Sequence, residues 1–192
     1  MRTLIVYTHP WEGSFNHFVL EQTIQHLQSQ NDTIDVIDLH KDHFKPDYTA
    51  EDLRLFSRGE YADPMAANYS ERLKRADRLV LIFPIWWFGM PAMLKGFFDK
   101  VLLKHHTYDE VDHQLKGLLD IPEALILTTG NVSKEILAQL GDPIGTNLAN
   151  AVLKTVGVHH TTWLHGQTIH LPESREQYLQ EINAYFKNDV AQ

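Results

Sequence analysis

Three consecutive aromatic residues, Trp86, Trp87 and Phe88, lie between Pro84 and Pro91 and follow an apolar run. A large aromatic side chain left in water forgoes roughly 1.5–3 kcal/mol of burial free energy, so a surface loop rarely presents three of them without a partner. A flat aromatic ligand or a second subunit would cover these rings. The alternative is that the rings pack beneath neighbouring loops.

A polar segment, residues 9–16, has the features of a phosphate site. Ser14 begins an expected helix, and the free backbone N–H groups and dipole of a helix N-terminus favour an anion. Asn16 and His9 add side-chain donors, of which His9 can be charged. The alternative is a helix N-cap with incidental polar residues. The chain contains neither GxGxxG nor GxxxxGK[ST], so the dinucleotide fingerprint and the P-loop are both missing.

A third segment, Thr128-Thr129-Gly130-Asn131, is expected to form a turn after a strand. Gly130 would let the backbone approach a ligand closely, and the exposed N–H groups and threonine hydroxyls are hydrogen-bond donors. The alternative is a simple turn without a ligand.

Expected strands alternate with expected helices along the chain, and they position these three segments. The strands span residues 3–8, 33–39, 78–83, 124–128 and 160–164. The helices span residues 14–30, 50–57, 69–75 and 133–155 (one or two helices), with one more after Pro91 and a last one opened by Pro172 and Glu173. The rest of residues 40–68 is expected to be irregular and residues 104–120 a loop, while Asp99 and Lys100 are assigned to a solvated helix face.

Five β–α units without repeats predict a parallel sheet covered by helices on both faces. The spacing favours a flavodoxin-like doubly wound sheet of order 2-1-3-4-5 over a barrel, which needs about 250 residues. No linker divides the chain, so we expect one domain over residues 1–192. In that order the ends of strands one, three and four are neighbours at the switch point. A phosphate site, aromatic walls and hydrogen-bond donors would then meet, and this combination fits flavin mononucleotide (FMN).

Composition excludes several other classes of function. The formal charge of −8 disfavours nucleic acid and anionic membrane surfaces as partners. The chain has no Cys, which removes disulfides, thiolate catalysis and iron–sulfur ligation and is compatible with the cytoplasmic location that we expect. The first apolar run is too short for a signal peptide, and none approaches the ~20 residues of a membrane span. We expect no metal, because the histidine spacing does not suit ligation and no HExxH occurs; no GxSxG supports a serine nucleophile.

The chain resembles the NAD(P)H:quinone oxidoreductases of flavodoxin-like fold, a group that includes DT-diaphorase and the ancillary oxidoreductases of glutathione-gated potassium efflux systems. The matching residues are Tyr7-Thr8-His9-Pro10 with Ser14-Phe15-Asn16, then Phe83-Pro84-x-x-Trp87-Phe88-Gly89-x-Pro91-Ala92-x-Leu94-Lys95-Gly96-x-Phe98, then Thr128-Thr129-Gly130. They occur in order and span most of the chain.

The resemblance implies a cofactor, an assembly and a substrate pocket. FMN, with FAD as the alternative, would be bound by His9, Ser14, Phe15, Asn16, Pro84, Ile85, Trp86, Trp87, Phe88, Thr128, Thr129 and Gly130. NAD(P)H would be the electron donor, and a quinone or a nitro or azo compound the acceptor. A homodimer would form two active sites at its interface. Tyr108 would reach the partner's substrate pocket, which Trp86 also lines.

The chain departs from DT-diaphorase at two places. Residues 131–142 contain neither the Tyr nor the His that assist flavin reduction there, and Trp86 replaces a Gln. We therefore assign no catalytic residue, because the cofactor would carry the hydride chemistry. We expect backbone N–H groups near Thr129 and Gly130 to stabilise the negative charge that develops on the flavin. Both substrates would stack in turn on one face of the flavin, which predicts ping-pong kinetics. Two alternatives are an FMN-binding regulatory subunit docked on a potassium efflux transporter and a one-electron carrier, although the flavodoxin phosphate loop TxTGxT is absent.

Overall fold

A central sheet of five parallel strands forms the middle layer of the computed structural model, which describes residues 1–189. The strands are β1 (Arg2–Tyr7), β2 (Thr33–Asp38), β3 (Arg78–Pro84), β6 (Ile121–Gly130) and β7 (Val158–Gln167). Their spatial order is β2-β1-β3-β6-β7, and this confirms the doubly wound order 2-1-3-4-5. Every residue of β3 is buried, as expected for a central strand covered on both faces.

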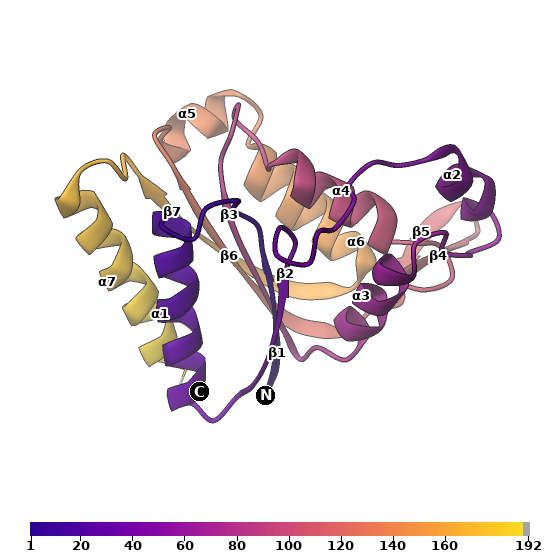
Figure 1. Cartoon of the computed structure of the whole chain (residues 1–192), viewed down its shortest axis with the longest axis horizontal. Coiled ribbons are helices and arrows are strands. Elements are labelled where there is room, and N and C mark those ends of the chain that lie inside the picture. The colour runs from indigo at the N-terminus through magenta and orange to yellow at the C-terminus, as the bar shows by residue number, and fades with distance from the viewer. Residues whose placement is uncertain (190–192) are drawn as a thin grey trace.

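Helices cover both faces of the sheet (Figure 1). One face carries α1 (Phe15–Ser29) and α7 (Pro172–Asp189), which lie side by side. The other face carries α3 (Pro64–Lys74), α4 (Ala92–Val101) and η1 (Pro143–Leu153), a helix with π-type hydrogen bonding. Each layer has its own apolar core, since alternate residues of a buried strand face opposite sides.

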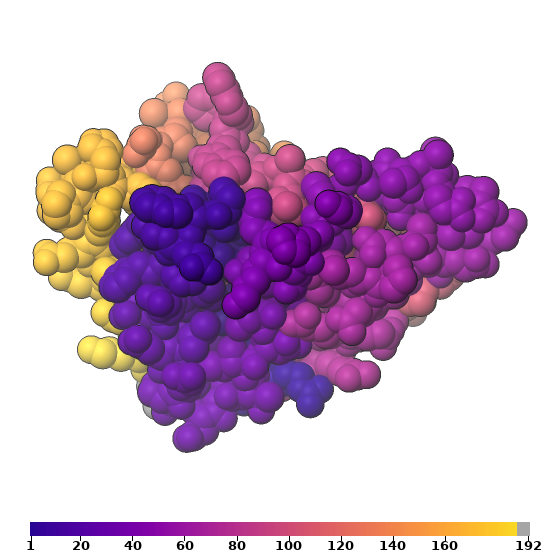
Figure 2. Space-filling view, viewed as in Figure 1, coloured from indigo at the N-terminus to yellow at the C-terminus, as the bar shows by residue number. Residues whose placement is uncertain are grey.

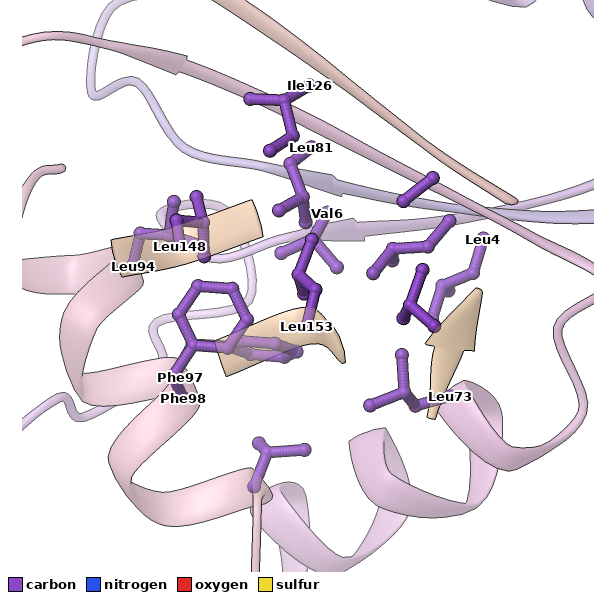
Figure 3. Close-up of a cluster of buried hydrophobic side chains, with 14 of the residues drawn as sticks. Leu4, Val6, Leu73, Leu81, Leu94, Phe97, Phe98, Ile126, Leu148 and Leu153 are labelled. Carbon is purple, nitrogen blue, oxygen red and sulfur yellow. The ribbon is translucent and has the colours of Figure 1, made fainter. Parts of the chain in front are cut away.

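The larger core lies between the sheet and α4 (Figure 3). Phe97 and Phe98 of α4 pack there with leucine side chains of η1 and with Val6 and Leu81 of the sheet. Burial of these side chains fixes α4 against the strands, and the loop that joins β3 to α4 therefore emerges at the carboxyl edge of the sheet.

Two expectations for the connecting segments are wrong. Residues 104–120 contain an antiparallel hairpin, β4 (Tyr108–Val111) and β5 (Gln114–Gly117), whose turn residues Asp112 and His113 both have positive φ. The strands are short and polar, so they lack the alternation that marks a hairpin in sequence. In addition, α3 begins at Pro64 rather than at residue 69, because Asp63 caps its first turn.

The remaining helices confirm the expected segments and add detail. The capped helix α2 (Ala50–Phe56) occupies the expected position. Residues 133–155 hold α5 (Lys134–Gln139), η1 and the short α6 (Lys154–Val156). Lys100 does not lie on a solvated face: it is buried, and its Nζ donates to Asp63 Oδ2 at 2.9 Å.

Candidate functional site

The three segments singled out by the sequence meet at the carboxyl edge of the sheet. Thr8 N–H donates to Ile82 O at 3.1 Å, and Ile85 N–H donates to Thr129 O at 2.7 Å. Asn16 Nδ2 donates to Thr129 Oγ1 at 2.6 Å, although the two residues are 113 positions apart. The ends of β1, β3 and β6 are therefore joined directly, at the switch point where open α/β sheets bind ligands.

Ser14 forms the N-cap of α1 and accepts a hydrogen bond from His17 N–H at 3.1 Å. The expectation that Ser14 caps the helix is thus correct. The N-terminus of this 15-residue helix lies at the site, where its free N–H groups favour an anion. The ring of Phe15 packs toward α7, 6.4 Å from Tyr178 and under the Arg175 guanidinium. Phe15 can contact a ligand at this edge only through its backbone.

His9 is half-buried, and burial lowers its pKa against the opposing effect of the Trp11 carbonyl. It is therefore neutral at pH 7. His9 Nδ1 lies 3.2 Å from both the N–H and the O of Trp11; where Nδ1 accepts from the N–H, Nε2 carries the proton and acts as donor. The ring of His9 lies 6.0 Å from that of Trp86, so the polar segment and the aromatic loop are in contact.

Four buried polar atoms in or beside this segment have no hydrogen-bond partner among residues 1–189, namely Tyr7 Oη, Thr8 Oγ1, Asn16 Oδ1 and His17 Nδ1. Buried polar groups in native proteins are nearly always paired. Among them the Thr8 hydroxyl can donate and Asn16 Oδ1 accepts, which fits a ligand that carries both phosphate oxygens and hydroxyl groups. The sequence analysis did not name Thr8 as a binding residue, although its position at the end of the expected first strand places it at the same edge of the sheet.

The aromatic loop is a two-residue turn closed by Trp86 N–H to Gly89 O at 3.0 Å and Gly89 N–H to Trp86 O at 3.1 Å. The two residues inside it, Trp87 and Phe88, have φ of 48° and 65°. This left-handed conformation is strained for bulky residues, by on the order of 1–3 kcal/mol each, and such strain clusters at functional sites.

The rings of the aromatic loop face solvent, so the idea that they pack beneath neighbouring loops is wrong. Trp87 is 95% exposed, and Trp86 and Phe88 are 46% and 45% exposed. Figure 2 shows the segment between β3 and α4 standing out from the surface at the top of the view. Pro84 and Ile85 are buried instead, so they form the rigid base of the loop.

Thr128, Thr129 and Gly130 belong to β6 and do not form a free turn. Thr129 pairs with Pro84 and Gly166, and Gly130 pairs only with Gln167. The Thr128 hydroxyl is engaged by His165 and Trp163 within the protein, whereas Thr129 Oγ1 accepts from Asn16 Nδ2 and keeps its own O–H for a ligand. A Cβ on Gly130 would make ordinary contact with His165 Cε1 and Ile85 Cβ, each at 3.5 Å, and Gly130 itself is partly exposed.

A buried histidine that the sequence did not single out lies behind Gly130. His165 of β7 contacts Thr128 Oγ1 through Nδ1 at 2.8 Å and Val132 O through Nε2 at 2.7 Å. Trp163 Nε1 donates to the same hydroxyl at 2.8 Å. No local motif marks these residues, because they meet Thr128 only through the pairing of β6 with β7.

Tyr108 does not join the other site residues within one chain. It is half-buried on β4 and lines an apolar cavity of about 310 Å³ with Leu102 and Val152. A second cavity, of about 460 Å³, borders the aromatic loop at Gly89 and shares Leu102 and Val152 with the first. The two cavities thus follow one apolar face along α4 and η1.

Over residues 1–189, no group of three His, Asp or Glu side chains has the arrangement of a metal site. Within the same residues, no helix has the length and hydropathy of a membrane span.

The sheet defines a flavodoxin-like α/β protein in which the three loops singled out by the sequence meet at the switch point. A family model described as a flavodoxin-like fold matches residues 1–189, and the chain belongs to that family.

Three known proteins place the chain further. Ribosyldihydronicotinamide dehydrogenase (quinone) of Homo sapiens is 28% identical over 160 residues, which cover 73% of this chain and 68% of that protein. The NAD(P)H:quinone oxidoreductase from Methanothermobacter marburgensis is 28% identical, with 98% of both chains covered and a TM-score of 0.88. The FMN-dependent NADH-azoreductase from Bacillus anthracis, solved with FMN, shares the fold: the identity is 17%, the TM-score 0.82, and 97% of this chain and 98% of that chain are covered. The resemblance to quinone reductases and the expectation of an oxidoreductase enzyme are confirmed.

Proposed function

We propose that this chain is an FMN-dependent NAD(P)H oxidoreductase that reduces a quinone or a similar aromatic acceptor, such as a nitro or azo compound, by a ping-pong mechanism. The observation that carries the proposal is the meeting of a helix N-terminus, unpaired buried polar atoms and solvent-facing aromatic rings at one switch point. When bound, the flavin accepts a hydride from the nicotinamide and passes two electrons to the acceptor.

The polar segment would bind the phosphate and ribityl groups. The first-turn N–H groups of α1 and the Nε2–H of His9 supply donors, and the Thr8 hydroxyl supplies another. Asn16 Oδ1 would accept from a ribityl hydroxyl, while its Nδ2 stays bonded to Thr129. A neutral His9 suits this role because it donates without depending on pH near 7.

The aromatic loop and the end of β6 would hold the ring system. Trp86, Trp87 and Phe88 provide a stacking wall, and the Thr129–Gly130 backbone provides dipoles for charge that develops on the ring. Because the same wall serves the nicotinamide and then the acceptor, the two substrates alternate. Trp86 replaces the Gln of DT-diaphorase and makes the pocket more apolar.

We further propose a cytoplasmic, single-domain homodimer in which Tyr108 of a second copy closes the pocket. Three observations support the dimer: Trp87 is almost fully exposed, Leu115 beside Tyr108 is 62% exposed, and an apolar face runs from one to the other. Docking on a potassium efflux transporter, which the resemblance also implied, has no supporting observation in the described residues, and neither has a role as a one-electron carrier.

The test is an absorbance spectrum of the purified protein with FMN or FAD, followed by anaerobic addition of NADPH and then NADH. We expect FMN to bind and its absorbance to bleach with at least one nucleotide, and a quinone to restore it. A bound flavin that neither nucleotide bleaches would contradict the reductase role. No binding of either flavin would overturn the site itself.

A further inference from the structure

A one-directional chain of hydrogen bonds passes behind the end of β6. Val132 O can only accept, so His165 carries its proton on Nε2, and Nδ1 must then accept from the Thr128 hydroxyl. The hydroxyl oxygen keeps its lone pairs for the Trp163 indole N–H. The donors therefore follow one another from Trp163 to Thr128 to His165 and end at Val132 O, and the Thr128 hydroxyl is much closer to His165 Nδ1, at 2.8 Å, than to its other acceptor, Leu164 O, at 3.5 Å.

His165 has the surroundings of a neutral residue held in one tautomer. It is 8% exposed, and burial lowers its pKa, with the nearby Lys134 acting in the same direction and Glu135 against it. Lys134 is fixed in turn, because its Nζ donates to Trp163 O at 2.7 Å and lies 4.4 Å from the centre of that indole ring.

The two residues that His165 contacts stand on either side of Thr129 and Gly130. Thr128 precedes this dipeptide in β6, and Val132 follows it after the strand has ended. The imidazole itself lies beneath the dipeptide, since a Cβ built on Gly130 would be 3.5 Å from His165 Cε1. Its two hydrogen bonds fix both ends of a five-residue segment in which Asn16 holds the Thr129 side chain and Gly130 has no side chain of its own.

We propose that His165 is the positioning residue of this segment, holding the Thr129–Gly130 backbone at the angle that the flavin ring requires. It acts through Thr128 and Val132 and does not touch the substrate. The inference rests on the proposed function, because it assigns the support of the same site.

The test compares three substitutions. His165→Phe keeps a flat ring and removes both hydrogen bonds, and we expect the FMN Kd to rise about tenfold, the value of roughly one lost buried bond. His165→Asn keeps an acceptor for Thr128, and His165→Gln keeps a donor for Val132, so both should recover part of the affinity. His159→Gln is the matched control, since His159 is an exposed residue at the other end of the same strand, paired with Asp120.

A second readout separates positioning from plain stability. The midpoint potential of bound FMN should fall in His165→Phe, with the reduced form losing about threefold more affinity than the oxidised form, because the misplaced backbone dipoles stabilise the reduced ring less. Lower stability alone would leave this ratio unchanged. Equal Kd and equal potential in a folded His165→Phe variant would overturn the proposal.

A measurement without flavin keeps this inference distinct from the proposed function. In the flavin-free protein, ¹⁵N NMR should show His165 protonated on Nε2 and bare on Nδ1, and His165→Phe should move the amide signals of Gly130 and Asn131. If that variant fails to fold, Thr128→Val removes the hydroxyl that donates to His165 Nδ1 and should also raise the FMN Kd. Wild-type protein that binds no FMN refutes the proposed function, whereas unmoved amide signals refute the role of His165.

Discussion

Asn16→Ala should separate the role of Asn16 in the fold from its role toward the cofactor. Asn16 is 2% exposed, its Nδ2 donates to Thr129 Oγ1 at 2.6 Å, and its Oδ1 is buried without a partner in the described chain. A neutral hydrogen bond contributes about 0.5–1.5 kcal/mol, whereas an unpaired buried acceptor costs about 1–3 kcal/mol. Removing the whole amide loses the hydrogen bond to Thr129 and also removes the cost of the unpaired Oδ1.

In the flavin-free protein these two terms oppose each other, so the free energy of unfolding should fall by at most about 0.5 kcal/mol, the largest loss less the smallest relief. With FMN bound, Oδ1 gains a ribityl donor, and the substitution then removes two favourable bonds. The FMN Kd should therefore rise roughly 5- to 150-fold, which corresponds to about 1–3 kcal/mol. Urea unfolding without flavin and fluorescence titration with FMN measure the two quantities.

Thr129→Val is the matched control because it removes the same bond between α1 and β6 and keeps Asn16 Oδ1. It leaves Asn16 Nδ2 unpaired, and it should therefore destabilise the flavin-free protein by about 1–3 kcal/mol while weakening FMN less than Asn16→Ala does. If Asn16→Ala lowers the stability of the flavin-free and FMN-bound proteins equally, Asn16 is only a bridge in the fold and the reasoning fails.

Three further outcomes test other parts of the structure. Trp87→Gly relieves a positive φ at a side chain that packs on nothing, so the melting temperature of the flavin-free protein should rise by about 2–4 °C while the KM for a quinone increases severalfold; a fall in both would contradict the strain argument. The pKa of His165 lies below its ordinary value of 6.5, so the unfolded state binds more protons below that pH. Stability should therefore be greatest above pH 6.5 and decline as the pH falls, and urea unfolding of His165→Phe should show a flatter decline. Lys100→Met breaks the buried bond to Asp63 and should lower the free energy of unfolding, measured by chemical denaturation, by about 1–3 kcal/mol. The loss is smaller than for a fully buried pair because Asp63 is partly exposed. The FMN Kd should not change.

The sheet and its three loops could be predicted from the sequence because the signals are local. The run 78–83 is continuous in apolar residues and is typical of a central parallel strand. Ser14 marks the start of α1, and the aromatic loop marks the end of β3. Once the strand order was inferred, the convergence of the loops followed from topology alone.

The buried side chains that hold the site in place could not be predicted, because their partners lie in distant segments of the chain. His165 faces Thr128 only through the register of β7 against β6, and Lys100 is buried only because Asp63 lies across from it at the start of α3. Nothing in the residues around either side chain signals these partners. The polar hairpin at Tyr108 was missed for the same reason, since its strands are defined by pairing and carry no apolar alternation.

The site combines a fixed half with an adaptable half. The strand ends, the Asn16–Thr129 bond and the contacts of His165 hold the polar half before any ligand binds, and such preorganisation contributes affinity. The aromatic half is a strained turn held by two backbone hydrogen bonds, with rings that contact little else. Under the proposed function, a ligand that interacts with the fixed half would be bound tightly and in one orientation. A ligand that interacts with the aromatic half meets a wall that can rearrange, which suits a cofactor that stays and substrates that exchange over it.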